Sequence, residues 1–152
     1  MRKFTMAIYI LILCKVPLSS TAQNDCKEPN SLVSITNMVT GKTELLVFTF
    51  TNPASVEMES AAAKPPFENY GGVKVKVKGS KFIEIKFHTL NPGCFPKKKT
   101  AFTSLVRDIK ETEFFEGYAT YVVGLNKGVR LEKNHIENGN KYRKFIFRFR
   151  KS

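Results

Sequence analysis

Tryptophan, acceptor sites for N-glycosylation and long apolar runs are all missing from the sequence. No asparagine has a serine or threonine two positions further on, which argues against a eukaryotic secretory glycoprotein. The longest apolar run, Met6 to Cys14, is about half the roughly 20 residues that a membrane-spanning helix requires. We therefore expect a chain that does not span a membrane.

The short apolar run instead fits a secretory signal peptide. It follows Met1-Arg2-Lys3 and ends before small residues at Ser19 to Ala22, the order of a basic, an apolar and a small-residue region. This pattern predicts a signal peptide over residues 1–22, a polar segment over 23–31 and one domain over 32–152. The protein is then secreted or periplasmic.

Cysteine is scarce, with three in the chain. Cys14 lies within the predicted signal peptide, so Cys26 and Cys94 remain as an even pair. In an oxidising compartment we expect these two to form a disulfide, which constrains the unfolded chain by about 4 kcal/mol on the loop-entropy argument.

Residues typical of catalysis are also few. The two histidines, His88 and His135, have no neighbour at metal-ligand or triad spacing. The acidic cluster Asp108 to Glu116 is interspersed with Arg107 and Lys110, as in a surface that forms ion pairs. We therefore predict no catalytic residue, no metal and no cofactor, and we rank an enzyme behind both functions considered below.

Basic residues are abundant: 25 lysines and arginines stand against 13 acidic residues. Without Arg2, Lys3 and Lys15 of the signal peptide, the charge is about +9. Such a charge favours contact with polyanions and does not bear on the fold.

Alternation of apolar and polar residues dominates the chain from Leu32 onward. Six to eight short strands separated by Gly, Pro and Asn turns, with little helix, predict a mainly-β, single-domain antiparallel sandwich or barrel-like fold. In the segment Gly71 to Lys81, "GGVKVKVKGSK", three valines alternate with lysines. We expect it to form a hairpin with Lys81 to Phe87, with the valines in the core and the lysines in water.

The solvated cations predicted by strand phase could form one field if their strands share a sheet. In the closing strand, Phe145, Phe147 and Phe149 point to the core, which argues against base stacking and hence against nucleic acid. The candidate polyanion-binding residues are Lys74, Lys76, Lys78, Lys81, Lys97, Lys98, Lys99, Arg148, Arg150 and Lys151.

Several segments, over roughly residues 32–150, resemble the AMIN-like domain of secreted bacterial envelope proteins. They are "TGKTELLVFTF", "KPPFENYGGVKVKV", "KFIEIKFHTLNPG" and "VRDIKETEFFEGYATYVVGL", and Phe115-Glu116-Gly117 with Gly124-Leu125 carries most of the similarity. Tyr121 stands where the family tends to have tryptophan. The resemblance implies a β-sandwich or barrel-like envelope domain without catalytic residues, and related AMIN domains are associated with peptidoglycan.

Two functions remain open at this point. The first is a non-enzymatic domain that binds an anionic cell-wall polymer, or another acidic surface, through a basic sheet face. The second is a secreted protein-interaction module, inhibitor or effector, which acts through the expected loops Asn91 to Lys99 and Asn126 to Asn140.

Overall fold

The computed structural model describes residues 28–52, 55–91, 97–99 and 105–152. The predicted signal peptide, Cys26 and Cys94 lie outside the described residues, and for Lys97 to Lys99 only the backbone is described.

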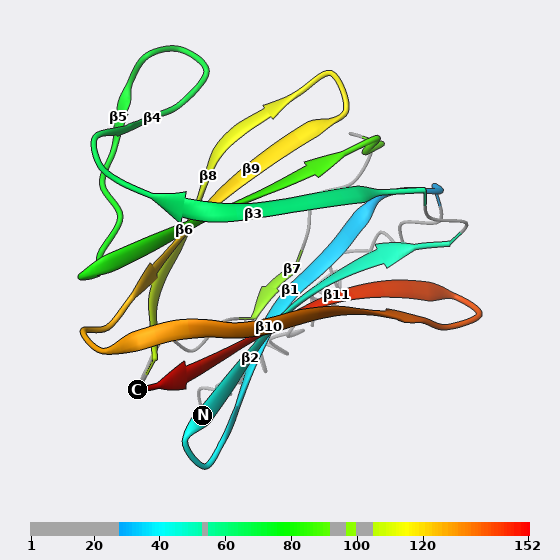
Figure 1. Ribbon diagram of the computed structural model, residues 1–152. Coiled ribbons are helices and arrows are strands. Elements are labelled where there is room, and N and C mark those ends of the chain that lie inside the picture. The colour runs from blue at the N-terminus through cyan, green and yellow to red at the C-terminus, as the bar shows by residue number, and fades with distance from the viewer. Residues whose placement is uncertain (1–27, 53–54, 92–96, 100–104) are drawn as a thin grey trace, which may run out of the picture.

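Two sheets form the body of the molecule (Figure 1). The first sheet has the order β10-β11-β2-β1-β7, and the second has the order β3-β6-β9-β8. A two-stranded ribbon, β4-β5, makes a third sheet. The strands are β1 (Leu32–Thr40), β2 (Thr43–Thr51), β3 (Glu57–Ala63), β4 (Phe67–Glu68), β5 (Lys74–Val75), β6 (Lys81–His88), β7 (Lys97–Lys99), β8 (Val106–Phe115), β9 (Tyr118–Leu125), β10 (Val129–Asn138) and β11 (Tyr142–Lys151).

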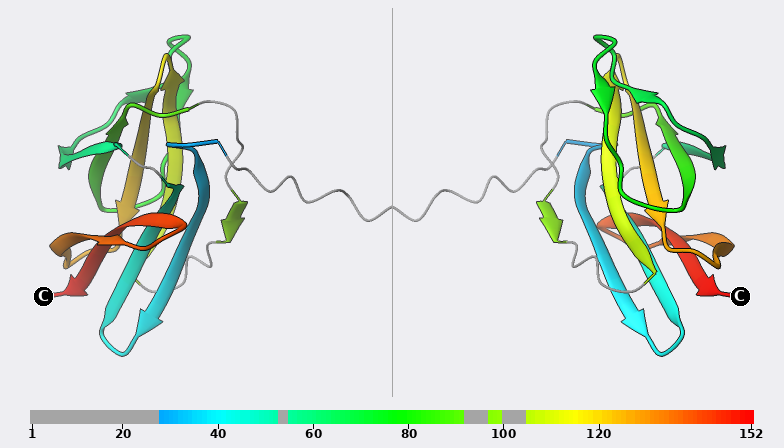
Figure 2. Two further views of the ribbon diagram at one scale, coloured as in Figure 1. Left: turned by 90° about the vertical axis from the view of Figure 1, so that its right-hand side faces the viewer. Right: turned by 90° about the vertical axis from the view of Figure 1, so that its left-hand side faces the viewer.

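The predicted mainly-β sandwich is confirmed. The two main sheets are separate and face each other, which Figure 2 shows from both sides. Strand pairing is antiparallel except between β1 and the short β7. The described residues contain no helix, and so none that could cross a membrane.

Aromatic side chains from both sheets fill the space between them. Phe48 of β2 packs against Phe87 of β6 and Tyr121 of β9, with ring centroids 4.9 and 5.3 Å apart. Phe145, Phe147 and Phe149 of β11 are fully buried, as their strand phase predicts. Burial of such rings, at roughly 25 cal/mol per Å² of apolar surface, stabilises the sandwich.

One carboxylate lies in this core. Glu44 of β2 is 0% exposed, and its Oε1 accepts a hydrogen bond from Nδ2 of Asn37 at 2.7 Å. Its Oε2 accepts hydrogen bonds from the backbone N–H groups of Leu105 and Val106, both at 2.9 Å. Because Val106 begins β8 of the other sheet, Glu44 ties the two sheets together at this end of the sandwich.

The prediction for "GGVKVKVKGSK" is wrong. Only Lys74 and Val75 form a strand, β5, and their partners are Glu68 and Phe67 of β4 instead of β6. The side chain of Val73 is exposed, and those of Val75 and Val77 are half-buried, so no valine of this row belongs to the core. The lysines are exposed, as predicted. The valines between them are not buried in the core, so the segment is not a strand with one buried and one solvated face.

The segment after β5 crosses β9 instead of pairing with β6. The carbonyl oxygen of Lys78 lies so close to Gly124 that a Cβ on Gly124 would be 2.0 Å from it. The backbone N–H of Lys78 donates to Oδ2 of Asp108 at 3.1 Å, and the N–H of Ser80 donates to the carbonyl oxygen of Leu125 at 2.7 Å. These contacts hold the segment across the outer side of the second sheet, where it has no free strand edge to join.

Candidate anion-binding face

Four basic side chains gather on the outer face of β10 and β11. In β11, Phe147 and Phe149 face the core, so Arg148 and Arg150 alternate to the outside. Lys133 lies directly opposite Arg148, and Arg130 lies directly opposite Arg150. We call these four residues, Arg130, Lys133, Arg148 and Arg150, the basic face.

Like charges directly opposite each other on two strands destabilise the pairing. Within the basic face, Glu132 offsets part of this repulsion, since its Oε1 lies 3.3 Å from an Nη of Arg150. A β-bulge between Leu131 and Lys133 inserts Glu132 into β10. The described acidic residues supply no further ion pair to this face at salt-bridge distance, so it keeps a positive charge.

Arg148 has a second unusual property. Its Nε atom is buried, yet it has no hydrogen-bond partner among the described residues. A buried donor without a partner costs roughly 1–3 kcal/mol.

Apolar residues adjoin the basic face within the same sheet. Leu45 of β2 lies opposite Arg148, and Met38 of β1 lies opposite Leu45. Met38 is 57% exposed, whereas Ile146 of β11 is buried. The cations therefore lie beside partly exposed apolar side chains of the same sheet.

The structure does not bring the predicted basic residues together on one face. Arg148 and Arg150 belong to the basic face, and Lys151 follows directly in β11, opposite Val129. Lys97 to Lys99 form β7, which pairs with Ser34 to Thr36 and is separated from β11 by β1 and β2.

The four remaining lysines, Lys74, Lys76, Lys78 and Lys81, lie with the second sheet. They belong to β5, to the segment that crosses Gly124 and to the start of β6. This is the opposite side of the sandwich from the basic face, so these lysines and the basic face do not form one field.

Sequence reasoning missed Arg130 and Lys133. The Asn138-Gly139-Asn140 turn marks a hairpin, which would have placed the preceding residues beside β11. The bulge at Glu132 then shifts the strand phase, so alternation alone does not show that Arg130 and Lys133 share a face.

The histidines and the acidic cluster form no catalytic arrangement among the described residues. His88 lies 4.0 Å from Glu59, and His135 lies 3.6 Å from Glu137. No group of three or more His, Cys, Asp or Glu residues in the described ranges is placed to hold a metal ion.

Within the acidic cluster, Lys110 lies 3.8 Å from Asp108, which is the ion pairing that we expected. The other two contacts are with hydroxyl groups. Glu111 accepts a hydrogen bond from the hydroxyl of Tyr121 at 2.8 Å, and Glu113 accepts one from Thr120 at 3.2 Å.

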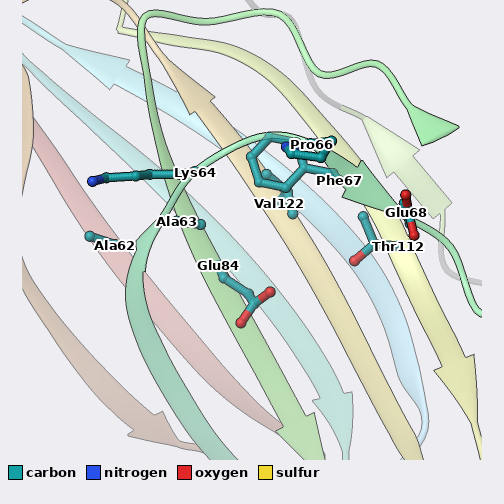
Figure 3. A pocket seen from close by; sticks show the side chains of 9 residues that line it. All are labelled: Ala62, Ala63, Lys64, Pro66, Phe67, Glu68, Glu84, Thr112 and Val122. Carbon is teal, nitrogen blue, oxygen red and sulfur yellow. The ribbon is translucent and has the colours of Figure 1, made fainter.

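A shallow hollow of about 310 Å³ lies on the outer side of the second sheet, below β4 (Figure 3). Glu84 of β6 and Thr112 of β8 supply polar groups, and Phe67 and Val122 supply apolar ones. Glu84 pairs with Lys86 at 3.1 Å, so its carboxylate is already partly neutralised. The described residues that line the hollow form no arrangement of nucleophile, base and orienting group.

Comparison with known proteins gives no relative: no known family, no curated protein and no solved structure matches the chain.

Proposed function

We propose that this protein is a non-enzymatic, secreted or periplasmic β-sandwich domain that binds an anionic polymer of the cell envelope. The contact surface is the basic face on β10 and β11. Carboxylates or phosphates of the polymer bind between Lys133 and Arg148 and between Arg130 and Arg150.

The observation that carries this proposal is that two pairs of basic residues lie directly opposite each other on β10 and β11. Lys133 opposite Arg148 and Arg130 opposite Arg150 repel each other in the free protein. An anion that contacts both members of such a pair removes this repulsion. Arginine suits the task because its planar guanidinium donates two parallel hydrogen bonds to one carboxylate or phosphate.

The wider chain supports the same function. Without the predicted signal peptide its net charge is about +9, which attracts polyanions over a distance of about one Debye length, roughly 8 Å at physiological salt. The similarity of its segments to the AMIN-like domain of envelope proteins points to the same compartment and to the wall polymer as the ligand.

Co-sedimentation with purified peptidoglycan tests the proposal. We expect the protein to pellet with the wall material at low salt and to stay in the supernatant at high salt, because the contacts are electrostatic. The double variant Lys133→Gln with Arg148→Gln should lose most of the low-salt binding.

A matched control removes two charges elsewhere. Lys74→Gln with Lys76→Gln lowers the net charge by the same amount on the other side of the molecule and should still pellet. Undiminished pelleting of the Lys133/Arg148 variant would contradict the proposal. The proposal would also be contradicted if the wild-type protein did not pellet with wall material and instead bound a protein partner through its loops.

A further inference from the structure

Exposed aromatic side chains gather at the end of the second sheet where β8 turns into β9. The side chain of Tyr70, in the loop between β4 and β5, is 70% exposed and stacks on Phe115, with ring centroids 4.7 Å apart and planes 17° from parallel. Phe114 and Tyr118 are exposed nearby in the chain. A cluster of exposed aromatic side chains is a candidate interaction surface.

The backbone holds these rings in place. Phe115 and Tyr118 face each other across the two-residue turn Glu116-Gly117, in which both residues have positive φ, 45° and 84°. This is the geometry of a type I′ hairpin turn, which fixes the twist and the register of the strands that it joins. In the other loop, Oδ1 of Asn69 accepts hydrogen bonds from the N–H groups of Gly71 and Val73, at 3.1 and 2.9 Å.

Between the two elements lies a hollow of about 260 Å³, and its lining is mixed. Tyr70 and Phe114 are among the lining residues, and Asn69, Glu111 and Glu113 contribute polar groups. Glu111 and Glu113 each use only their Oε2 in the hydrogen bonds to Tyr121 and Thr120. The amide group of Asn69 donates no hydrogen bond to a described residue.

We propose that this hollow and the stacked rings of Tyr70 and Phe115, together the Tyr70 platform, bind a neutral oligosaccharide. A pyranose ring has a flat side of C–H groups, which packs on the electron-rich face of an aromatic ring. Its edge carries hydroxyl groups, which donate to the carboxylates of Glu111 and Glu113 and accept from the amide of Asn69. Ligand sites of this kind combine apolar walls with a few placed polar groups.

Other ligand classes fit the Tyr70 platform less well. The two carboxylates repel an anionic ligand, so the polymer that we assign to the basic face does not belong here. A purely apolar ligand would leave Asn69, Glu111 and Glu113 without hydrogen bonds. A bare metal ion has no cluster of ligands among the described residues.

Titration of the full chain with xylohexaose and cellohexaose, followed by NMR, tests the inference. We expect shifts at Asn69, Gly71 and Glu113 for at least one of the two sugars. Tyr70→Ala should weaken that binding about tenfold or more, which is the cost of removing a central aromatic contact. The melting temperature should stay unchanged, because the side chain of Tyr70 is mostly exposed.

Tyr142→Ala is the matched control, since Tyr142 is an exposed tyrosine on β11 of the other sheet. It should bind the sugar as the wild type does. The inference is overturned if neither sugar causes shifts, if both tyrosine variants weaken binding equally, or if tetramethylammonium alone occupies the hollow.

Salt separates this site from the basic face. Sugar binding should be the same at low and high salt, and it should survive Lys133→Gln with Arg148→Gln. Failure of the sugar titration therefore leaves the wall-polymer proposal standing, and the reverse also holds.

Discussion

At the scale of single residues, two buried polar groups hold the sandwich together. The carboxylate of Glu44 accepts hydrogen bonds in the core from Asn37 and from the backbone N–H groups of Leu105 and Val106, where β8 begins. Tyr121 is buried among phenylalanines, yet its hydroxyl donates to Glu111. Each group satisfies donors or acceptors that would otherwise be buried without partners.

Glu44→Ala should lower the free energy of unfolding by about 3–5 kcal/mol, because it leaves the N–H groups of Leu105 and Val106 without acceptors in the core. Urea unfolding followed by circular dichroism measures this change. Glu57→Ala, which removes an exposed glutamate of β3, is the control and should cost less than about 0.5 kcal/mol. Equal stability of the two variants would show that Glu44 does not tie the sheets together.

The buried side chain of Tyr121 should also make the stability of the protein depend on pH in the alkaline range. Burial raises the pKa of Tyr121 well above its usual range, and the charge and hydrogen bond of Glu111 raise it further. An unfolded chain loses this proton near pH 10, whereas the folded protein keeps it. The unfolded state then binds fewer protons, so stability that is fully present below pH 10 is lost as the pH rises above it.

Urea unfolding at pH 9, 10 and 11 checks this effect against Tyr121→Phe, which has no proton to lose. Above pH 10 the wild type should lose stability more steeply than the variant, by up to about 1.4 kcal/mol per pH unit. The two proteins share every other side chain, so contributions from other groups cancel in the comparison. Parallel pH profiles would contradict the account of Tyr121.

At the scale of elements, Gly124 is where the segment after β5 crosses β9. Gly124→Ala would place a Cβ 2.0 Å from the carbonyl oxygen of Lys78, so the crossing segment must move. We expect a loss of about 1–3 kcal/mol in stability, as for other overpacked contacts. The amide of Lys78 should also exchange with solvent faster, because its hydrogen bond to Asp108 breaks.

Gly71→Ala is the control for Gly124→Ala. A Cβ on Gly71 would meet only Oδ1 of Asn69, at 3.5 Å, which is an ordinary contact. This variant should keep the stability and the slow Lys78 exchange of the wild type. An equal loss in the two variants would mean that the crossing at Gly124 is not tightly packed.

The same elements show what alternation in a sequence can predict. Phe145, Phe147 and Phe149 recur at every second position and lie in the core, because a period of two follows directly from strand geometry. Val73, Val75 and Val77 have the same period but are not in the core. Alternation predicts that a segment would have one apolar and one polar face as a strand. It does not predict whether another strand has a free edge with which the segment can pair.

The candidate site was predictable to a similar extent. Strand phase placed Arg148 and Arg150 on the outside of β11, and the structure agrees. Their partners Arg130 and Lys133 depend on the register of β10 and on its bulge. Register is set by contacts between segments that are distant in the sequence, so the residue pattern of one strand does not contain it.

At the scale of the whole molecule, the two sides of the sandwich differ in charge. The acidic residues Asp108, Glu111, Glu113 and Glu116 lie on or next to β8, at one edge of the second sheet, and offset the charge of Lys74, Lys76, Lys78 and Lys81 on that side. The basic face lies on the first sheet. A polyanion should therefore bind to one side of the molecule, and the position of a charge should matter more than the net charge.

The salt dependence of binding to dextran sulfate, a soluble polyanion, tests this central claim most directly. Two variants have the same net charge: Lys133→Glu with Arg148→Glu, and Lys74→Glu with Lys76→Glu. Each cation that neutralises the polymer releases counterions, so the slope of log Kd against log salt counts the contacts. We predict that the Lys133/Arg148 variant loses affinity and has a shallower slope, whereas the Lys74/Lys76 variant keeps the slope of the wild type. Equal losses of slope in the two variants would contradict a localised basic face.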